Sequence, residues 1–221
     1  MSSRLFCAVA LVSVVLWSPV AFGEELLLIN KLRDFVSTGP DNSLDRVPAL
    51  FSISGGASRK ILSTSSEETN IHSHYRKPGA ARLRNYTYSG EMRILDSGGG
   101  IGVTFYSDYP RSDTYYRLRM YGGGSFHIEP HPDGEYTLSG SLDSGVTPVA
   151  GIWQKFKIIV RTSRARTTIR AKVWPRGSQP PPTWHVDVVD EGANRILKGK
   201  PGVWSMGSGA KEWRNLRVVT Q

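Results

Sequence analysis

Apolar and polar residues alternate in short runs along most of the chain, and glycine or proline separates one run from the next. In the run 82–96, Tyr86, Tyr88 and Met92 share one side, because successive side chains of a strand point to opposite faces. Residues 24–35 fit either a short helix or a first strand, since periodicity alone does not separate the two. Comparable strand-like runs lie at 101–106, 113–121, 125–129, 152–162, 166–174, 184–189, 202–206 and 213–219.

This pattern predicts about ten to twelve strands in one domain, which favours two packed sheets over one open sheet. We therefore expect an all-β fold, built as a two-sheet antiparallel sandwich. The segment 163–165 between two runs predicts a hairpin. Pro130 and Pro132 cannot donate ladder hydrogen bonds, so the chain is expected to leave the sheet there. Four large aromatic residues of the central and closing strands are expected in the core, namely Trp153, Phe156, Trp204 and Trp213.

The N-terminal residues have the features of a signal peptide. A short positive segment precedes the apolar run 5–17, and Ala21 and Gly23 then supply small residues two apart. A signal peptidase reads this pattern, with cleavage before Glu24. A retained membrane anchor is the alternative, but an apolar run of about 13 residues is short of the roughly 20 that a spanning helix needs. We predict a signal peptide at 1–23, a single domain at 24–221, and a secreted or periplasmic location.

Cysteine content and charge narrow the chemistry. The single cysteine, Cys7, lies in the apolar run, so the mature domain has neither a disulfide nor a thiolate nucleophile. Lys and Arg number 28 against 19 Asp and Glu, which gives a formal net charge of +9. This excess favours an anionic partner, such as an acidic polysaccharide or an anionic envelope or membrane surface, or it serves solubility alone. No nucleic-acid partner is expected.

Several segments resemble, in their order along the chain, the strands of the concanavalin A-like jelly-roll superfamily. They are Tyr88-Ser89-Gly90-Glu91-Met92-Arg93-Ile94, Gly100-Ile101-Gly102-Val103-Thr104-Phe105, Tyr115-Tyr116-Arg117-Leu118, Gly151-Ile152-Trp153-Gln154-Lys155-Phe156, Gly202-Val203-Trp204 and Trp213-Arg214-Asn215-Leu216-Arg217-Val218. This superfamily contains laminin-G-type modules, legume-type lectins, glucanases and secreted bacterial domains of unknown function. The resemblance covers residues 82–219 well and the earlier part loosely. It implies a jelly roll, and it implies the fold much more than any activity.

Two of the runs combine an apolar side with a side rich in aromatic and basic residues. Aromatic rings stack on sugar rings, and arginine grips a carboxylate or sulfate with two parallel hydrogen bonds. The leading hypothesis is a lectin-like carbohydrate-binding module for a glycan, with an acidic polysaccharide favoured. Ordinary solvated sheet faces are the alternative interpretation. The predicted ligand-binding residues are Tyr115, Arg117, Arg119 and Tyr121 in one row, and Arg170, Lys172 and Trp174 in a second row that could complete a groove.

Catalytic motifs of the resembling families are absent from the sequence. Retaining glucanases of this fold are similar to one another in a Glu-x-Asp-x-Glu strand, and alginate-lyase relatives in a Gln-x-His strand. Neither pattern occurs in this chain. No catalytic residue is therefore assigned, and the alternative function is a glycoside hydrolase or polysaccharide lyase of the same fold with a non-standard active site.

Two clusters contain residue types that bind metals. His127, Glu129 and His131, at alternate positions of one run and followed by Asp133, could hold a metal ion. A second cluster near a loop, Asp187, Asp190 and Glu191, has the oxygen ligands that calcium prefers. A solvated surface turn is the favoured interpretation of both clusters. No metal ligand or cofactor is assigned, and calcium stays open.

Overall fold

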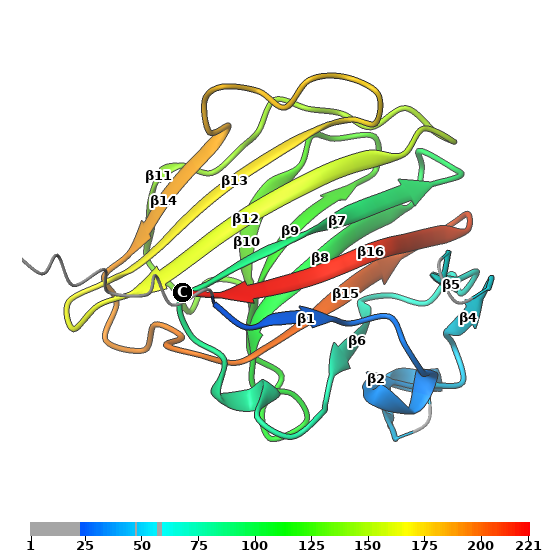
Figure 1. The fold of residues 1–221 in the computed structure, drawn as a ribbon, viewed down its shortest axis with the longest axis horizontal. Coiled ribbons are helices and arrows are strands. Elements are labelled where there is room, and N and C mark those ends of the chain that lie inside the picture. The colour runs from blue at the N-terminus through cyan, green and yellow to red at the C-terminus, as the bar shows by residue number, and fades with distance from the viewer. Residues whose placement is uncertain (1–22, 47, 57–58) are drawn as a thin grey trace, which may run out of the picture.

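A computed structural model describes residues 23–46, 48–56 and 59–221, and it shows two antiparallel sheets packed face to face (Figure 1). This confirms the predicted all-β sandwich. Apart from Gly23, the signal peptide predicted at 1–23 lies outside the described residues, so the peptide and the location outside the cytoplasm stay predictions. Within the described residues, no helix combines the length and the apolar character that crossing a membrane requires.

Sheet A has nine strands, and its long central strands lie side by side in the front layer of Figure 1. Its order is β11, β14, β13, β12, β7, β16, β5, β4, and β1 pairs with β16 as well. The bounds are β1 Glu25–Leu27, β4 Ser52–Ser54, β5 Ile61–Thr64, β7 Tyr86–Ile94, β11 Leu138–Ser141, β12 Gln154–Thr162, β13 Thr167–Pro175, β14 Val186–Asp190 and β16 Lys211–Thr220.

Sheet B has seven strands in the order β10, β9, β8, β15, β6, β2, β3. Its strands are β2 Phe35–Thr38, β3 Leu44–Asp45, β6 Ile71–Tyr75, β8 Gly100–Ser107, β9 Tyr115–Tyr121, β10 His127–His131 and β15 Lys200–Met206. Within the described part of the chain, three single-turn 3-10 helices lie in the connections, η1 Leu32–Asp34, η2 Pro40–Asn42 and η3 Ala80–Arg82.

The core lies between the sheets and follows from the alternation along the strands. Tyr86, Tyr88 and Met92 of β7 point inward and are fully buried. Buried aromatic side chains also join the two sheets by hydrogen bonds to main-chain carbonyls. The Tyr88 hydroxyl donates to the Gly202 carbonyl at 2.9 Å, and the Trp213 indole N–H donates to the Gly102 carbonyl at 3.0 Å. Because these buried polar groups form hydrogen bonds, they avoid the desolvation penalty of an unpaired donor in the core.

All four aromatic residues expected in the core are buried, but two of them lie outside the cluster between the sheets. Phe156 and Trp213 belong to the apolar core as predicted. Trp204 is buried on the outer face of sheet B instead. Trp153 is buried between two guanidinium groups, with the Arg93 and Arg214 carbons 4.7 Å and 3.9 Å from its ring centre. Burial of a tryptophan therefore does not by itself mean contact with the core.

The hairpin prediction holds, and the prediction for the proline segment is correct at Pro132 and wrong at Pro130. Thr162 of β12 stands opposite Thr167 of β13, as a hairpin at 163–165 requires. Residues 24–35 contain the short strand β1 and η1. The chain does not leave the sheet at Pro130, because β10 runs through that residue as the last strand of sheet B. The Ile128 N–H donates outward to the Leu142 carbonyl, so the nitrogen of Pro130, two residues on, also faces away from β9.

Candidate functional site

The two predicted rows of ligand-binding residues lie on opposite outer faces of the sandwich. Tyr115, Arg117, Arg119 and Tyr121 project from β9 on the outer side of sheet B, whereas Arg170, Lys172 and Trp174 project from β13 on the outer side of sheet A. Their inward neighbours, Leu118 and Ala171 among them, meet in one core. Packed sheets are about 10 Å apart, so the two rows cannot form one groove. That part of the sequence interpretation is wrong, because strand alternation does not reveal which sheet holds a strand.

The row on β9 is also less exposed than a solvated face would be. Tyr115 is 0% and Arg117 4% exposed, whereas Tyr121 at the strand end is 44% exposed. These residues belong to a network on the outer side of sheet B that we call the polar face. Its members are Asn70, His72, His74, Asp113, Tyr115, Arg117 and Trp204.

Asn70 and Trp204 hold Arg117 in place. The Asn70 Oδ1 atom accepts hydrogen bonds from Arg117 Nη1 at 3.0 Å, Trp204 Nε1 at 2.6 Å and the Tyr115 hydroxyl at 3.3 Å. The guanidinium groups of Arg117 and Arg119 both lie 5.3 Å from the Trp204 ring centre. Cation–π contacts of this kind strengthen as water is excluded. The arrangement fixes an arginine fork on the sheet surface.

The two histidines of β6 form a hydrogen-bonded chain with Thr104. His72 Nδ1 and His74 Nε2 are 2.7 Å apart, and His74 Nδ1 is 3.1 Å from the Thr104 hydroxyl. A neutral imidazole has one N–H, so one ring donates and its neighbour accepts. At the other end, His72 Nε2 lies 3.1 Å from Asp113, and the second oxygen of Asp113 lies 3.0 Å from His131 Nε2.

Burial sets the protonation of this chain. It lowers the pKa of His72, and it lowers the pKa of His74 well below the usual histidine value, with the neighbouring His72 adding to the effect. Both rings are therefore neutral at neutral pH. Burial works to raise the pKa of Asp113, but its contacts with His131 and His72 outweigh that and hold the pKa below the usual range. A carboxylate thus lies beside neutral imidazoles, which is the composition of an acid–base centre.

Tyr109 covers the histidine pair. Its ring centre lies 4.7 Å from that of His72 and 5.3 Å from that of His74, and its hydroxyl donates to the Ser37 carbonyl at 3.0 Å. Burial raises the pKa of Tyr109 to about 12, so this hydroxyl stays protonated. Both histidines are fully buried as a result.

The clusters considered for metals are engaged in other contacts. Glu129 forms ion pairs with Arg117 and Arg119, and His131 binds Asp113. Asp187 pairs with Arg170 at 3.0 Å, and Asp190 accepts a hydrogen bond from the Tyr116 hydroxyl at 2.5 Å. In the part of the chain that the structure describes, no group of three or more histidine, cysteine, aspartate or glutamate residues has the arrangement that holds a metal ion.

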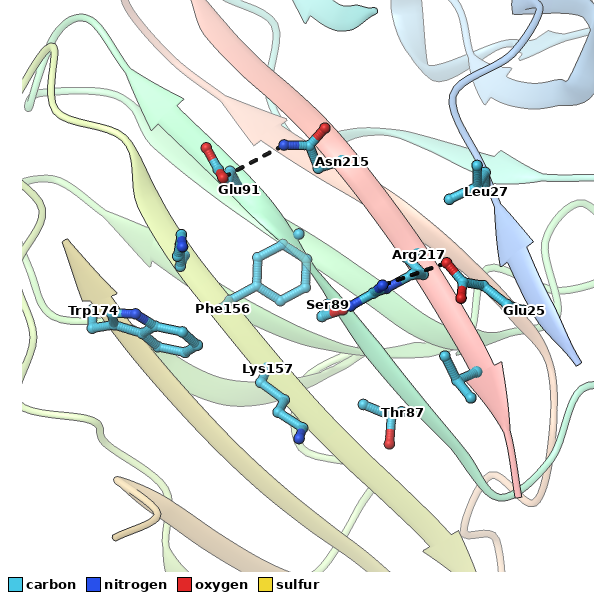
Figure 2. A pocket seen from close by; sticks show the side chains of 13 residues that line it. Glu25, Leu27, Thr87, Ser89, Glu91, Phe156, Lys157, Trp174, Asn215 and Arg217 are labelled. Carbon is cyan, nitrogen blue, oxygen red and sulfur yellow. Dashed lines mark hydrogen bonds and ion pairs between the residues drawn. The ribbon is translucent and has the colours of Figure 1, made fainter. Parts of the chain in front are cut away.

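The outer side of sheet A has an open groove of about 690 Å³, which we call the sheet A groove. Figure 2 shows Trp174 and Lys157 on one side of Ser89, and Arg217 with Glu25 on the other. The short Ser89 side chain leaves the floor low between longer neighbours. Trp174 is the residue of the predicted rows that lines this groove, and Lys172 lies beside it, with its ammonium 6.0 Å from the Trp174 ring centre and 5.1 Å from that of Trp184.

Strand register arranges the cations of this face in a row. Lys157 stands opposite Lys172 on one side and Ser89 on the other, and Ser89 stands opposite Arg217. Neighbouring strands are about 4.8 Å apart, so Lys172 and Arg217 are separated by roughly 14 Å along the backbone. A bulge at Asn215, which has a φ of 54°, keeps Arg217 outside while Leu216 and Val218 point into the core.

The acidic residues of the groove are paired, and two of its lysines are not. Glu91 accepts hydrogen bonds from Arg214 at 2.8 Å and 2.7 Å, and Glu25 pairs with Arg217 at 3.4 Å. Lys155 and Lys157 have no ion pair or hydrogen bond from their ammonium groups within the described ranges. The groove therefore presents unpaired positive charge next to an aromatic ring.

The sequence interpretation missed His72, His74, Asn70 and Trp204. A signal was available, since His72 and His74 alternate on a strand and must point the same way. Gly202 also stands opposite His74, where a side chain would collide with Thr104 and His74. A histidine that faces a glycine on the neighbouring strand indicates space kept for a polar side chain.

Together the topology and packing define a two-sheet jelly-roll sandwich, the fold that the resemblance to concanavalin A-like proteins implies. Among solved structures, the chain is similar to a protein of unknown function with a galectin-like fold from Bacillus subtilis, at 13% identity and a TM-score of 0.55 over 90% of this chain and 96% of that one. It is also similar to a protein proposed to be a β-glucanase, from Mycobacterium abscessus, at 11% identity and a TM-score of 0.50 over 90% and 99%. A legume lectin-like domain from Entamoeba histolytica aligns at 11% identity and a TM-score of 0.47 over 86% and 91%.

The sequence matches no family model and no curated protein. At these identities, the structural likeness shows the fold and leaves the function to the residues of this chain.

Proposed function

We propose that this protein acts outside the cytoplasm and binds glycans in the sheet A groove, acidic glycans best. The observation that carries the proposal is the pair of unpaired lysines, Lys155 and Lys157, beside the half-buried ring of Trp174. A tryptophan face offers an apolar platform for a sugar ring, and ammonium groups attract carboxylate or sulfate substituents. The row from Lys172 to Arg217 runs across the strands, which suits an extended chain more than a single sugar.

The proposal places the ligand on sheet A and not on the polar face. On β9, the arginines are already paired with Glu129, and the Tyr115 ring is stacked on His131 at 4.9 Å. Those groups have little left to offer a ligand. The lysines of the sheet A groove are free to do so.

Calorimetric titration of the full-length protein tests the site. The probes are a hexamer of galacturonic acid and a neutral glucose hexamer of the same length. We expect Lys155→Ala/Lys157→Ala to weaken binding of the acidic hexamer about tenfold, or about 1.4 kcal/mol, and to leave the neutral hexamer almost unaffected. Trp174→Ala should weaken both. Exposed charges are screened over about 8 Å at physiological salt, so added salt should reduce only the acidic affinity.

Lys31→Ala/Arg33→Ala is the matched control, since it removes two exposed cations that do not line the groove. Equal affinity of the wild type and the double lysine variant for the acidic hexamer would refute the sheet A groove as the site. A loss of the same size in the control would mean that binding follows net charge and not this groove.

The polar face favours a second candidate function, proton transfer to or from a glycan. His72 and Asp113, which lie 3.1 Å apart, are groups of the kind that exchange protons. Because Tyr109 covers the histidines, a substrate reaches them only after that ring moves. Prolonged incubation of the protein with each of the two hexamers tests for catalysis. New sugar chain ends that disappear in His72→Gln would support a hydrolase or lyase, and intact hexamers would exclude one for these substrates.

A further inference from the structure

A second cavity, of about 910 Å³, lies at one end of the sandwich among connections that are distant in sequence. It is lined by the end of β3, by η3, by the connection between β8 and β9, and by the connection between β14 and β15. Figure 1 shows the last of these in orange and η3 in teal along the lower side of the molecule. We call this cavity the end pocket, and it shares no lining residue with the sheet A groove.

The end pocket is strongly and one-sidedly charged. One carboxylate, Asp108, faces six cations, which leaves an excess of five positive charges. That carboxylate is itself taken, because Arg111 Nε donates to it at 2.9 Å and the Ser112 hydroxyl at 2.8 Å. The cations are Arg46, Arg82, Arg111, Arg195, Lys198 and Lys200.

Half of these cations have free donor groups. Arg46, Arg82 and Lys198 are exposed, and within the described ranges no ion pair or hydrogen bond engages their charged ends. The other half are held by the protein. Lys200 donates to the Tyr109 carbonyl, and Arg195 donates to the carbonyls of Gly192 and Arg164. The engaged cations give the pocket a fixed positive charge, and the free ones can donate hydrogen bonds to a ligand.

Such a cluster is unfavourable without a counter-anion. Like charges around one cavity repel one another, and the burial that lowers the pKa of Lys200 shows that part of the cluster is shielded from water. A single carboxylate would leave most of the excess charge uncompensated. Phosphate and sulfate groups match the guanidinium fork with two hydrogen bonds, and closely spaced groups of this kind supply several negative charges.

We propose that the end pocket binds a ligand that carries at least two closely spaced phosphate or sulfate groups. This site is separate from the sheet A groove and does not depend on the proposed glycan binding. The same chemistry occurs in soluble polyanions and in anionic headgroups at a lipid surface. The experiment therefore needs one probe for each source.

Inorganic tripolyphosphate is the soluble probe, titrated by calorimetry into the full-length protein. We expect Arg82→Ala/Lys198→Ala to weaken tripolyphosphate binding at least tenfold and to flatten its salt dependence. Both residues are exposed and unpaired, so the melting temperature without ligand should stay that of the wild type. Lys31→Ala/Arg33→Ala removes the same number of exposed charges from a surface that lines neither cavity, and this matched control should retain the affinity.

Co-sedimentation with vesicles of phosphatidylcholine containing cardiolipin, whose headgroup carries two phosphates, identifies the source. Sedimentation that is lost in Arg82→Ala/Lys198→Ala would assign the pocket to a lipid headgroup, and tripolyphosphate binding without sedimentation would assign it to a soluble polyanion. Absence of tripolyphosphate binding would overturn the proposal. An equal loss of affinity in Lys31→Ala/Arg33→Ala would also overturn it, while leaving the test of the sheet A groove by sugars intact.

Discussion

Trp213 offers a direct test of how the sheets are joined. The residue is fully buried, its ring packs 6.4 Å from that of Phe51, and its indole N–H binds the Gly102 carbonyl across the sandwich. Replacing a buried tryptophan by alanine costs about 3–5 kcal/mol in cavity and lost transfer energy. Leaving the Gly102 carbonyl without its donor adds about 1 kcal/mol. Trp213→Ala should therefore lower the free energy of unfolding by about 4–6 kcal/mol.

Denaturant unfolding followed by circular dichroism measures this value, and a thermal melt checks it. In a domain of this size, each kcal/mol shifts the melting temperature by about 2–4 °C, so a fall of about 10–20 °C is expected. Trp213→Phe keeps most of the apolar volume and should fall between the alanine variant and the wild type. Trp184→Ala is the control, because that ring is half-buried on the outer face. A melting temperature within two degrees of wild type for Trp213→Ala would refute the placement of this residue between the sheets.

Two further predictions concern the buried histidine and a glycine. Burial lowers the pKa of His74 in the folded state, so below about pH 6.5 the unfolded chain binds more protons than the folded chain. The free energy of unfolding should therefore decrease as the pH is lowered, by up to about 1.4 kcal/mol per pH unit for this residue. The free energy of unfolding, measured with denaturant between pH 4.5 and 6.5, should therefore change less with pH for His74→Gln than for the wild type. An equal pH dependence in the two proteins would contradict the assignment. A methyl group at Gly90 would lie 2.6 Å from Leu216, so Gly90→Ala should cost about 1–3 kcal/mol, and Ser89→Ala next to it should be nearly neutral in the same denaturation assay.

The sequence predicted the strands and their inner faces because alternation is a local property. The inward side of β7 and the hairpin between β12 and β13 follow from neighbours in the chain alone. The pairing of β6 with β15 joins His72 to Trp204 across more than a hundred residues, and nothing local encodes it. For this reason the sequence could not decide whether β9 and β13 share a sheet.

The site was harder to predict than the fold, because a connecting loop can cover a sheet face and bury side chains that point away from the core. Tyr115 points away from the core, as the alternation predicts. It is nevertheless buried, and Tyr109 from the connection between β8 and β9 packs on the neighbouring His72. Binding residues on a wet strand were predicted from residue type, and Trp174 of that set lines the sheet A groove. The role of Lys155 and Lys157 depends on which acids are already paired, which is a property of the folded molecule.

The position of Pro130 bears on how the protein behaves at high concentration. An edge strand with free outward N–H groups is a template on which a second molecule can add a strand, and such addition leads to aggregation. Ile128 on the outer side of β10, and Phe126 just before the strand, donate hydrogen bonds to the segment 142–146 of the same chain. The next outward nitrogen belongs to Pro130 and has no hydrogen to give. This edge of sheet B is thus closed to intermolecular sheet extension, first by the chain itself and then by a proline ring.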